Sequence, residues 1–216
     1  MDKIVEEFKK LSIAAVSDAM DKMGIHGAAV GIAPINYGYK MVGRAYTVKY
    51  LPVALDKGTV GDYIDEVPEG GVVVLDNAGR LDCTVWGDIL TAVAHMKKIS
   101  GTVIHGVCRD VAHSLDLKYP IFSRGKFMRT GKDRVDAVAY NVPISLGDVQ
   151  VRPGDIIYGS DDGVLVIHKE KEAEILAVAQ MIEEKEEGIR KAVMDGTPLK
   201  QAREKFGYHN LQTKDK

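Results

Sequence analysis

The sequence predicts one α/β domain, built on a central sheet in which at least two strands run parallel. Residues 71–76 contain an unbroken apolar core at 72–75, which is typical of a strand buried on both faces of a sheet, and residues 102–108 predict the next strand. Between them lie apolar residues at helical spacing, so the chain order is strand, helix, strand. No Pro-, Ser- or Gly-rich linker interrupts the 216 residues, and we expect a single domain, 1–216, with a frayed tail at 209–216.

The first half of the chain alternates helix and strand signals. Residues 12–23 carry apolar side chains three and four positions apart, which predicts an amphipathic helix that ends at Gly24. A β-like pattern covers residues 43–50. Gly87 and Asp88 then predict an N-capped start for the helix between the two apolar strands, because an aspartate before an apolar periodic run is a common cap.

The second half is richer in strand signals. After the strand at 102–108, a short helix reaches Leu117 and is ended by Pro120. Short strands are expected at residues 138–144, 149–151, 156–158 and 164–167. A charged helix follows at 170–195, and we expect it to be interrupted or to end near Gly188.

Composition and charge exclude several functional classes. Hydrophobic residues form 45% and charged residues 28% of the chain, as in an ordinary globular protein. The formal net charge of −2 gives no global attraction to nucleic acid or to anionic lipid, and no apolar run is long enough to cross a bilayer. The first residues lack the pattern of a signal peptide. We therefore expect a cytoplasmic protein with a small-molecule partner, no nucleic acid and no membrane.

One stretch is locally basic and contains an aromatic residue, Phe127. Such a stretch would suggest RNA, but the chain offers no aromatic platform and no net positive charge. It either lines the mouth of a substrate site or is a solvated loop. Its basic residues are Arg124, Lys126, Arg129, Lys132 and Arg134.

The cysteines and histidines suggest no zinc site. Cys83 and Cys108 form neither a CxxC nor a zinc-knuckle pattern, and we expect buried free thiols. The six histidines make no H-x3-H or HExxH pair. His105 falls on the strand at 102–108, where a histidine with satisfied hydrogen bonds in the core is the simpler expectation.

Three polar residues are expected to meet at one edge of the sheet. In a right-handed strand, helix, strand unit both strands point the same way, and the loops that leave their C-terminal ends lie together. The first loop leads to Asp88, and the second strand leads directly to Arg109 and Asp110. The three side chains should therefore converge.

Such a group of residues suits a metal and a small acid. Two aspartates offer the oxygen ligands that Mg²⁺ or Mn²⁺ prefers, while Arg109 offers a planar donor fork for a carboxylate. The N–H groups of Ile89 and Leu90, at the start of a helix, could hold the same carboxylate. The alternative is structural: Asp88 and Asp110 as simple N-caps, and Arg109 in an ion pair.

The spacing of these residues resembles a known family signature. Asp88, then twenty residues, then Arg109 and Asp110 is similar to the D-x20-R-D motif of class II pyruvate aldolases, typified by 4-hydroxy-4-methyl-2-oxoglutarate/4-carboxy-4-hydroxy-2-oxoadipate aldolase. The wider family includes the regulator of ribonuclease E activity A. The similarity extends to residues 17–20, 43–48, 71–76 and 153–166.

The resemblance implies a fold and a role for each site residue. It implies a swivelling β/β/α domain with a central sheet flanked by helices. Asp110 would ligate a divalent metal, Mg²⁺ or Mn²⁺, and Arg109 would contact the pyruvyl unit of the substrate. Asp88 would orient water on the metal, and Gly87 with the backbone at Ile89 and Leu90 would receive the substrate carboxylate.

The resemblance also implies an assembly. It predicts a homotrimer or a dimer of trimers with active sites between subunits, and a glutamate from the C-terminal helix of a neighbouring subunit. Glu186 is the closest match to that glutamate, although Glu183, Glu184 and Glu187 lie beside it and a charge run is usually a solvated face.

The expected activity is a metal-dependent lyase that cleaves a 4-hydroxy-2-oxo acid to pyruvate, with oxaloacetate decarboxylation as a side activity. The alternative is a non-catalytic regulator that binds an RNA-processing enzyme, because the ribonuclease regulators share the fold. Those regulators lack the acidic residue after the arginine, and here Asp110 is present. The family has also been labelled a methyltransferase, but no glycine-rich cofactor loop follows an early strand.

Overall fold

The computed structural model describes residues 2–208 and 211. The chain forms two compact units, one of residues 28–169 and one that combines residues 1–27 with 170–216. The expectation of a single domain stays a prediction. The frayed tail expected at 209–216 lies outside the described residues except for Leu211, whose side chain is buried.

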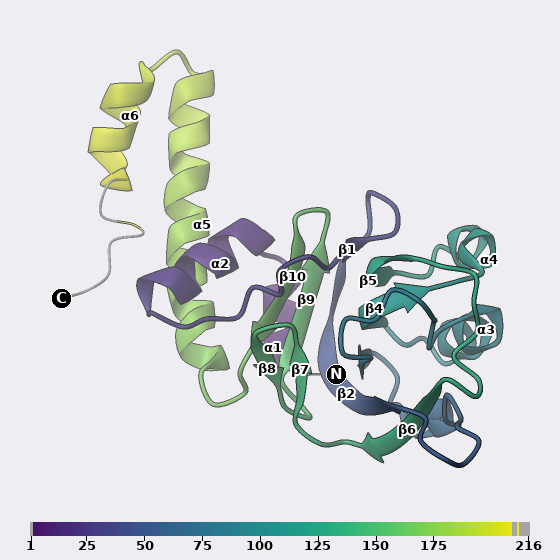
Figure 1. The fold of residues 1–216 in the computed structure, drawn as a ribbon. Coiled ribbons are helices and arrows are strands. Elements are labelled where there is room, and N and C mark those ends of the chain that lie inside the picture. The colour runs from purple at the N-terminus through teal and green to yellow at the C-terminus, as the bar shows by residue number, and fades with distance from the viewer. Residues whose placement is uncertain (1, 209–210, 212–216) are drawn as a thin grey trace. The chain divides into compact units, whose positions relative to one another are not determined.

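The unit of residues 28–169 contains an eight-stranded mixed sheet (Figure 1). Along the sheet the order is β1-β5-β4-β3-β2-β9-β10, with β6 paired to β2. The pairs β2–β3, β3–β4 and β4–β5 are parallel, and the others are antiparallel. The strands are β1 (Ala33–Pro34), β2 (Met41–Pro52), β3 (Val72–Asp76), β4 (Gly101–Cys108), β5 (Ile121–Lys126), β6 (Val135–Tyr140), β9 (Ile156–Ser160) and β10 (Gly163–Ile167).

The two ends of this sheet come close together. The backbone N–H of Ala29, just before β1, donates to the carbonyl of Val164 in β10 at 2.9 Å. The sheet is therefore nearly closed. A separate antiparallel hairpin is formed by β7 (Ile144–Leu146) and β8 (Val149–Val151). The predicted α/β class with parallel strands is confirmed.

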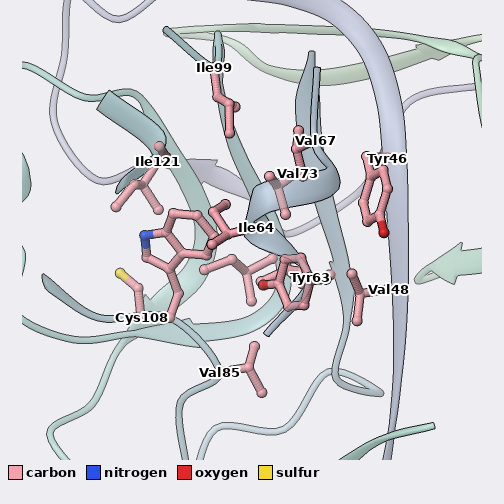
Figure 2. Close-up of a cluster of buried hydrophobic side chains, with 14 of the residues drawn as sticks. Tyr46, Val48, Tyr63, Ile64, Val67, Val73, Val85, Ile99, Cys108 and Ile121 are labelled. Carbon is pink, nitrogen blue, oxygen red and sulfur yellow. The ribbon is translucent and has the colours of Figure 1, made fainter. Parts of the chain in front are cut away.

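Apolar clusters cover both faces of the parallel strands, which explains the unbroken apolar run in β3. Val73 and Leu75 of β3 point into one cluster, drawn in part in Figure 2, together with residues of α3 (Asp88–Met96) and η1 (Tyr63–Glu66). The alternate β3 residues point into the other cluster, which includes the β7–β8 hairpin. The short helix α4 (Val111–Asp116) packs against the first cluster through Val111. A strand buried on both faces needs no polar alternation.

The second unit is helical. It contains α1 (Lys3–Phe8), α2 (Ile13–Lys22), α5 (Glu172–Met194) and α6 (Leu199–Phe206). Ser12 caps α2 by accepting from the Ala15 N–H, and the helix lies where the apolar spacing predicted one. The Ser12 N–H and hydroxyl donate to Glu183 Oε2 on α5, at 2.8 and 2.6 Å. No helix among the described residues is both long and apolar enough to cross a membrane.

Gly188 does not break the last long helix, contrary to expectation. Helix α5 continues from Glu172 to Met194, and a Cβ built at Gly188 would lie 2.5 Å from Cε1 of Phe206 in α6. The glycine therefore permits the two helices of this antiparallel pair to approach, and its cost to helix propensity is offset by that packing.

Two further boundaries differ from expectation. The strand expected at 138–144 is split into β6 and β7 because Asn141 has a φ of 52° and Pro143 has no N–H to donate. Asp88 is also the first residue of α3 rather than its cap, a position that Gly87 holds.

A largely buried contact between polar side chains links β3, β4 and the β7–β8 hairpin. Asp76 Oδ1 lies 3.4 Å from His105 Nδ1, and Asp76 Oδ2 accepts from the Ser145 N–H at 3.3 Å. Burial would raise the pKa of Asp76, but the hydrogen bonds with His105 and with the backbone of Ala78 and Ser145 outweigh burial, and the pKa is lowered from 3.8. His105 is thus a partly buried histidine with satisfied hydrogen bonds, where the sequence suggested a core histidine.

The lowered pKa of Asp76 predicts a pH-dependent contribution to stability. A carboxyl whose pKa is depressed by folding stabilises the folded state above its unfolded pKa, and that contribution is lost as the pH falls through the folded pKa. Asp76→Asn should therefore lower the free energy of unfolding by about 1–3 kcal/mol at pH 7. Urea titrations should show this difference shrink below pH 3.8. A difference that stays constant down to the acid limit would contradict the assignment.

Candidate active site

The structure brings Asp88, Arg109 and Asp110 together at the C-terminal edge of the parallel strands. Asp110 Oδ2 accepts from the Asp88 backbone N–H at 3.2 Å and lies 3.2 Å from Arg109 Nε. The Arg109 N–H donates to the Trp86 carbonyl at 3.1 Å, which joins the end of β4 to the segment before α3. The convergence expected from the strand order is therefore present in the structure.

Buried hydroxyl groups hold the segment that leads into α3. The Thr84 hydroxyl donates to the carbonyls of Trp86 and Val107, each at 2.9 Å, and the Trp86 indole N–H donates to the Thr91 hydroxyl at 2.8 Å. Thr91 in turn donates to the Gly87 carbonyl at 2.8 Å. These side chains are almost fully buried, and their hydrogen bonds hold the backbone at Gly87 in position.

Gly87 and Asp110 fit each other closely. A Cβ built at Gly87 would lie 2.7 Å from Asp110 Oδ2 and 3.3 Å from Arg109 Nε. Asp110 itself has a φ of 54° and a ψ of 39°, the left-handed region that aspartate tolerates better than most residues. Its side chain makes no capping bond to α4, so the interpretation of Asp110 as a simple N-cap is not supported.

Several polar atoms of this group have no partner among residues 2–208 and 211. They are the terminal guanidinium nitrogens of Arg109, Oδ1 of Asp110 and Oδ2 of Asp88. The Ile89 N–H is not free, because it donates to Asp88 Oδ1 at 2.8 Å. The Leu90 N–H makes no such bond. The cluster therefore presents two carboxylate oxygens and one planar cation to a ligand.

The donor set suits a hard divalent cation that keeps several waters. Within the described part of the chain, no three His, Cys, Asp or Glu residues form a group that could hold a metal. Asp88 and Asp110 offer two carboxylates, and Mg²⁺ is commonly held by one or two carboxylates plus water and substrate oxygens. The residues present therefore fit such an ion, with Asp110 as the ligand proposed from the sequence.

Arg109 lines two pockets. The larger, of about 310 Å³, is shared with Asp110 and with residues 126–128. The smaller, of about 120 Å³, is shared with residues 84–87 before α3 and with Asp88, Ile89 and Leu90 at the start of α3. The sequence left open whether the basic stretch borders a substrate site, and the pairing of β5 with β4 brings residues 126–128 beside Arg109 and Asp110.

Some side chains of the basic stretch at residues 124–134 contact other protein groups, and others line a pocket. Arg124 donates to the Gly79 carbonyl at 3.1 Å, Arg134 donates to the carbonyls of Thr130 and Lys132, and Arg129 lies over the Phe127 ring. Lys126 lines the larger pocket. The expectation that this stretch borders the substrate site therefore has structural support at Lys126, and Arg124 belongs to neither pocket.

Glu186 belongs to the helical unit. It lies on α5, and its Oε2 is 3.5 Å from Arg190 Nη1, while Arg190 also contacts Glu183 and Glu187. Glu183 is additionally committed to Ser12, and its pKa is lowered: burial opposes the shift, and the bonds from Ser12 and Arg190 cause it. In the part of the chain that the structure describes, Glu186 pairs with Arg190 alone, and its role in a neighbouring active site stays a prediction.

Residues 13–166 match the RraA-like family, described as Aldolase/RraA. The chain is 42% identical over 212 residues to protein DlpA of Legionella pneumophila, covering 96% of this chain but only 34% of DlpA, about a third of its length. It is 35% identical over 193 residues to a protein of Halalkalibacterium halodurans named "Putative 4-hydroxy-4-methyl-2-oxoglutarate aldolase", covering 88% of this chain and 89% of that protein.

A solved structure agrees with the fold. Streptomyces coelicolor RraAS2, described as an unusual member of the RNase ES inhibitor RraA protein family, superposes with a TM-score of 0.80 at 28% identity, covering 88% of this chain and 96% of the other. This agreement supports the swivelling β/β/α fold with a sheet flanked by helices, and the resemblance drawn from the D-x20-R-D spacing is confirmed. The chain therefore belongs to the RraA-like family of Aldolase/RraA proteins.

Proposed function

We propose that this protein is a divalent-metal-dependent lyase that cleaves a 4-hydroxy-2-oxo acid and releases pyruvate. One observation carries the proposal: the Asp110 carboxylate is held between the Asp88 N–H and Arg109 Nε, while the rest of the Arg109 guanidinium stays open. A site that only stabilised a helix start would not place Arg109 in the lining of two pockets, with Asp110 in the larger and Asp88 in the smaller. The named aldolase relative supports the same reaction class.

Arg109 would bind and stabilise the reacting end of the substrate. Its terminal nitrogens form a planar fork that matches a carboxylate or the oxygen on which negative charge develops as the C3–C4 bond breaks. When bound, Mg²⁺ or Mn²⁺ held by Asp110 would supply Lewis-acid stabilisation of the same charge. The contact between Asp110 and Arg109 Nε fixes the orientation of the guanidinium group. Arg109 therefore needs little reorganisation as negative charge develops on the substrate.

Asp88 would assist proton transfer from the 4-hydroxyl group of the substrate. The 4-hydroxyl must lose its proton as the C3–C4 electron pair moves to C3 and the C2 oxygen, and C3 must then gain a proton to give pyruvate. Asp88 Oδ2 has no hydrogen-bond partner among the residues that the structure describes, and it would hold the water that accepts the first proton. The same site would decarboxylate oxaloacetate, where the C3–C4 pair moves in the same direction and C4 leaves as CO₂. The Leu90 N–H and Gly87 would lie beside the substrate carboxylate.

A regulatory role is the second candidate. The observation that favours it is the similarity to a protein described as belonging to an RNase inhibitor family. A regulator would bind a protein partner through its surface and would need neither Asp110 nor a metal. The assay below separates the two, because only the lyase proposal predicts pyruvate.

The first test measures pyruvate with coupled lactate dehydrogenase. We expect release from 4-hydroxy-4-methyl-2-oxoglutarate and from oxaloacetate with Mg²⁺ or Mn²⁺, and loss of release with EDTA. Asp110→Asn keeps a residue that tolerates the left-handed backbone but removes the charge, and Arg109→Gln removes the fork. Each should lower kcat/KM by roughly 100-fold or more. Wild-type protein that gives no metal-dependent pyruvate, or variants that retain full release, would exclude the lyase.

Gly87→Ala tests the close fit at Asp110. The added methyl group would lie 2.7 Å from Asp110 Oδ2, so the carboxylate must move while the buried hydrogen bonds of Thr84 and Thr91 stay in place. We expect kcat/KM to fall roughly 10- to 100-fold, as after loss of a supporting contact to a metal ligand, with little change in melting temperature. Unchanged activity would show that the position of Asp110 does not matter.

Glu186→Gln tests the proposed contribution from a neighbouring subunit of a homotrimer or dimer of trimers. Glu187→Gln is the matched control, because Glu187 lies on the same helix and also contacts Arg190 at 3.5 Å. We expect kcat to fall roughly tenfold or more for Glu186→Gln alone, the usual range for a residue in proton transfer. Equal effects of the two variants would mean that both act through Arg190.

A further inference from the structure

The larger pocket beside Arg109 is lined by Arg109 and Asp110 and also by residues outside the cluster of Asp88, Arg109 and Asp110. Its walls are the end of β4, the start of α4 and residues 126–128 at the end of β5. Its volume of about 310 Å³ is at the low end of the range for small-molecule sites, roughly 300–1,000 Å³. A substrate held at Arg109 by its pyruvyl end would therefore direct its other end toward residues 126–128 or toward the smaller pocket.

Strand pairing places Lys126 next to this cluster. In the parallel β4–β5 pair, Cys108 is the partner of Lys126, and a register shift between Ile104 and Val107 precedes this point. The Phe127 N–H donates to the Cys108 carbonyl at 2.9 Å, so the pairing continues past the end of β5. Lys126 is thus fixed in the backbone beside the residue that precedes Arg109.

The Lys126 ammonium group is uncommitted. It forms no hydrogen bond or ion pair with any residue in the described part of the chain, and its side chain is exposed. By contrast, Arg124 and Arg134 donate to backbone carbonyls, and Arg129 lies over the Phe127 ring. Lys132 is equally exposed but lines neither pocket beside Arg109.

The pocket lining therefore carries two cations, Arg109 and Lys126, and one anion, Asp110. The negative charge of Asp110 is already paired with Arg109 through the contact at Nε. An unpaired ammonium group at the distal wall favours an anionic group on the ligand, and the neighbouring Met128, which is 75% exposed, offers an apolar surface to carbon.

We propose that Lys126 binds the distal carboxylate of the substrate, so that the site selects 2-oxo diacids over 2-oxo monoacids. This inference rests on the proposed lyase function for the orientation of the substrate. It assigns the specificity of the reaction to a residue on β5, outside the D-x20-R-D motif.

The test compares two substrates that differ only at C5. The diacid is 4-hydroxy-2-oxoglutarate, and the monoacid is 4-hydroxy-2-oxopentanoate, which has a methyl group in place of the distal carboxylate. The variants are Lys126→Gln, Lys126→Arg and the matched control Lys132→Gln. Pyruvate release gives kcat and KM for each pair in the presence of Mg²⁺ or Mn²⁺.

We expect Lys126→Gln to raise KM for the diacid roughly tenfold or more, since bonds to charged groups are among the stronger ones. Its kcat, and both constants for the monoacid, should change less than about twofold, because the reacting groups are untouched. Lys126→Arg should retain the preference for the diacid, and Lys132→Gln should match the wild type. Equal changes for both substrates, or no change, would overturn the assignment.

Binding separates failure of this inference from failure of the lyase proposal. Calorimetric titration of the metal-loaded protein with 2-oxoglutarate and 2-oxopentanoate, which lack the 4-hydroxyl group and cannot be cleaved, measures the subsite without turnover. If the wild type releases no pyruvate but Lys126→Gln weakens binding of the diacid alone, the lyase proposal fails and the subsite stands. If the variant binds both acids as the wild type does, or if neither acid binds the wild type, the subsite is excluded.

Discussion

The parallel pairing of β3, β4 and β5 is the constraint on which the candidate site depends. Parallel strands end at the same edge of a sheet, so the segments after β3 and β4 must leave side by side. The Thr84 hydroxyl, which donates to the Trp86 and Val107 carbonyls, then ties the first segment to the second strand. Asp88 and Asp110 meet because of this pairing, although twenty-one residues separate them along the chain.

Much of this arrangement could be predicted from the sequence because the deciding signals are local. The apolar runs of β3 and β4, the helix between them and the Arg109 and Asp110 pair all lie within one strand, helix, strand unit. The handedness of such units is nearly fixed, so the convergence of three side chains follows from element order alone. The D-x20-R-D spacing added the chemistry, which element order could not supply.

What the sequence could not predict depends on tertiary contacts. Gly188 has the pattern of a helix end, but Phe206 packs against it and α5 continues. From the sequence, the N–H of Ile89 is expected to be free at a helix start, but in the structure it donates to Oδ1 of Asp88. Lys126 looks like one of five equivalent basic residues, and only the register between β4 and β5 distinguishes it from Lys132.

The backbone at Asp110 argues that its position serves more than the fold. A left-handed residue costs about 1 kcal/mol or more relative to a helical one, and glycine would avoid most of that cost. The Asp110 side chain makes no capping bond to α4. Its carboxylate instead accepts from the Asp88 N–H and contacts Arg109 Nε, at a point where a side chain at position 87 would have no room. Backbone strain that is held in place by surrounding contacts is common at functional residues. This strain, together with the open guanidinium of Arg109, supports the proposed active site over a pair of helix starts that happen to be close.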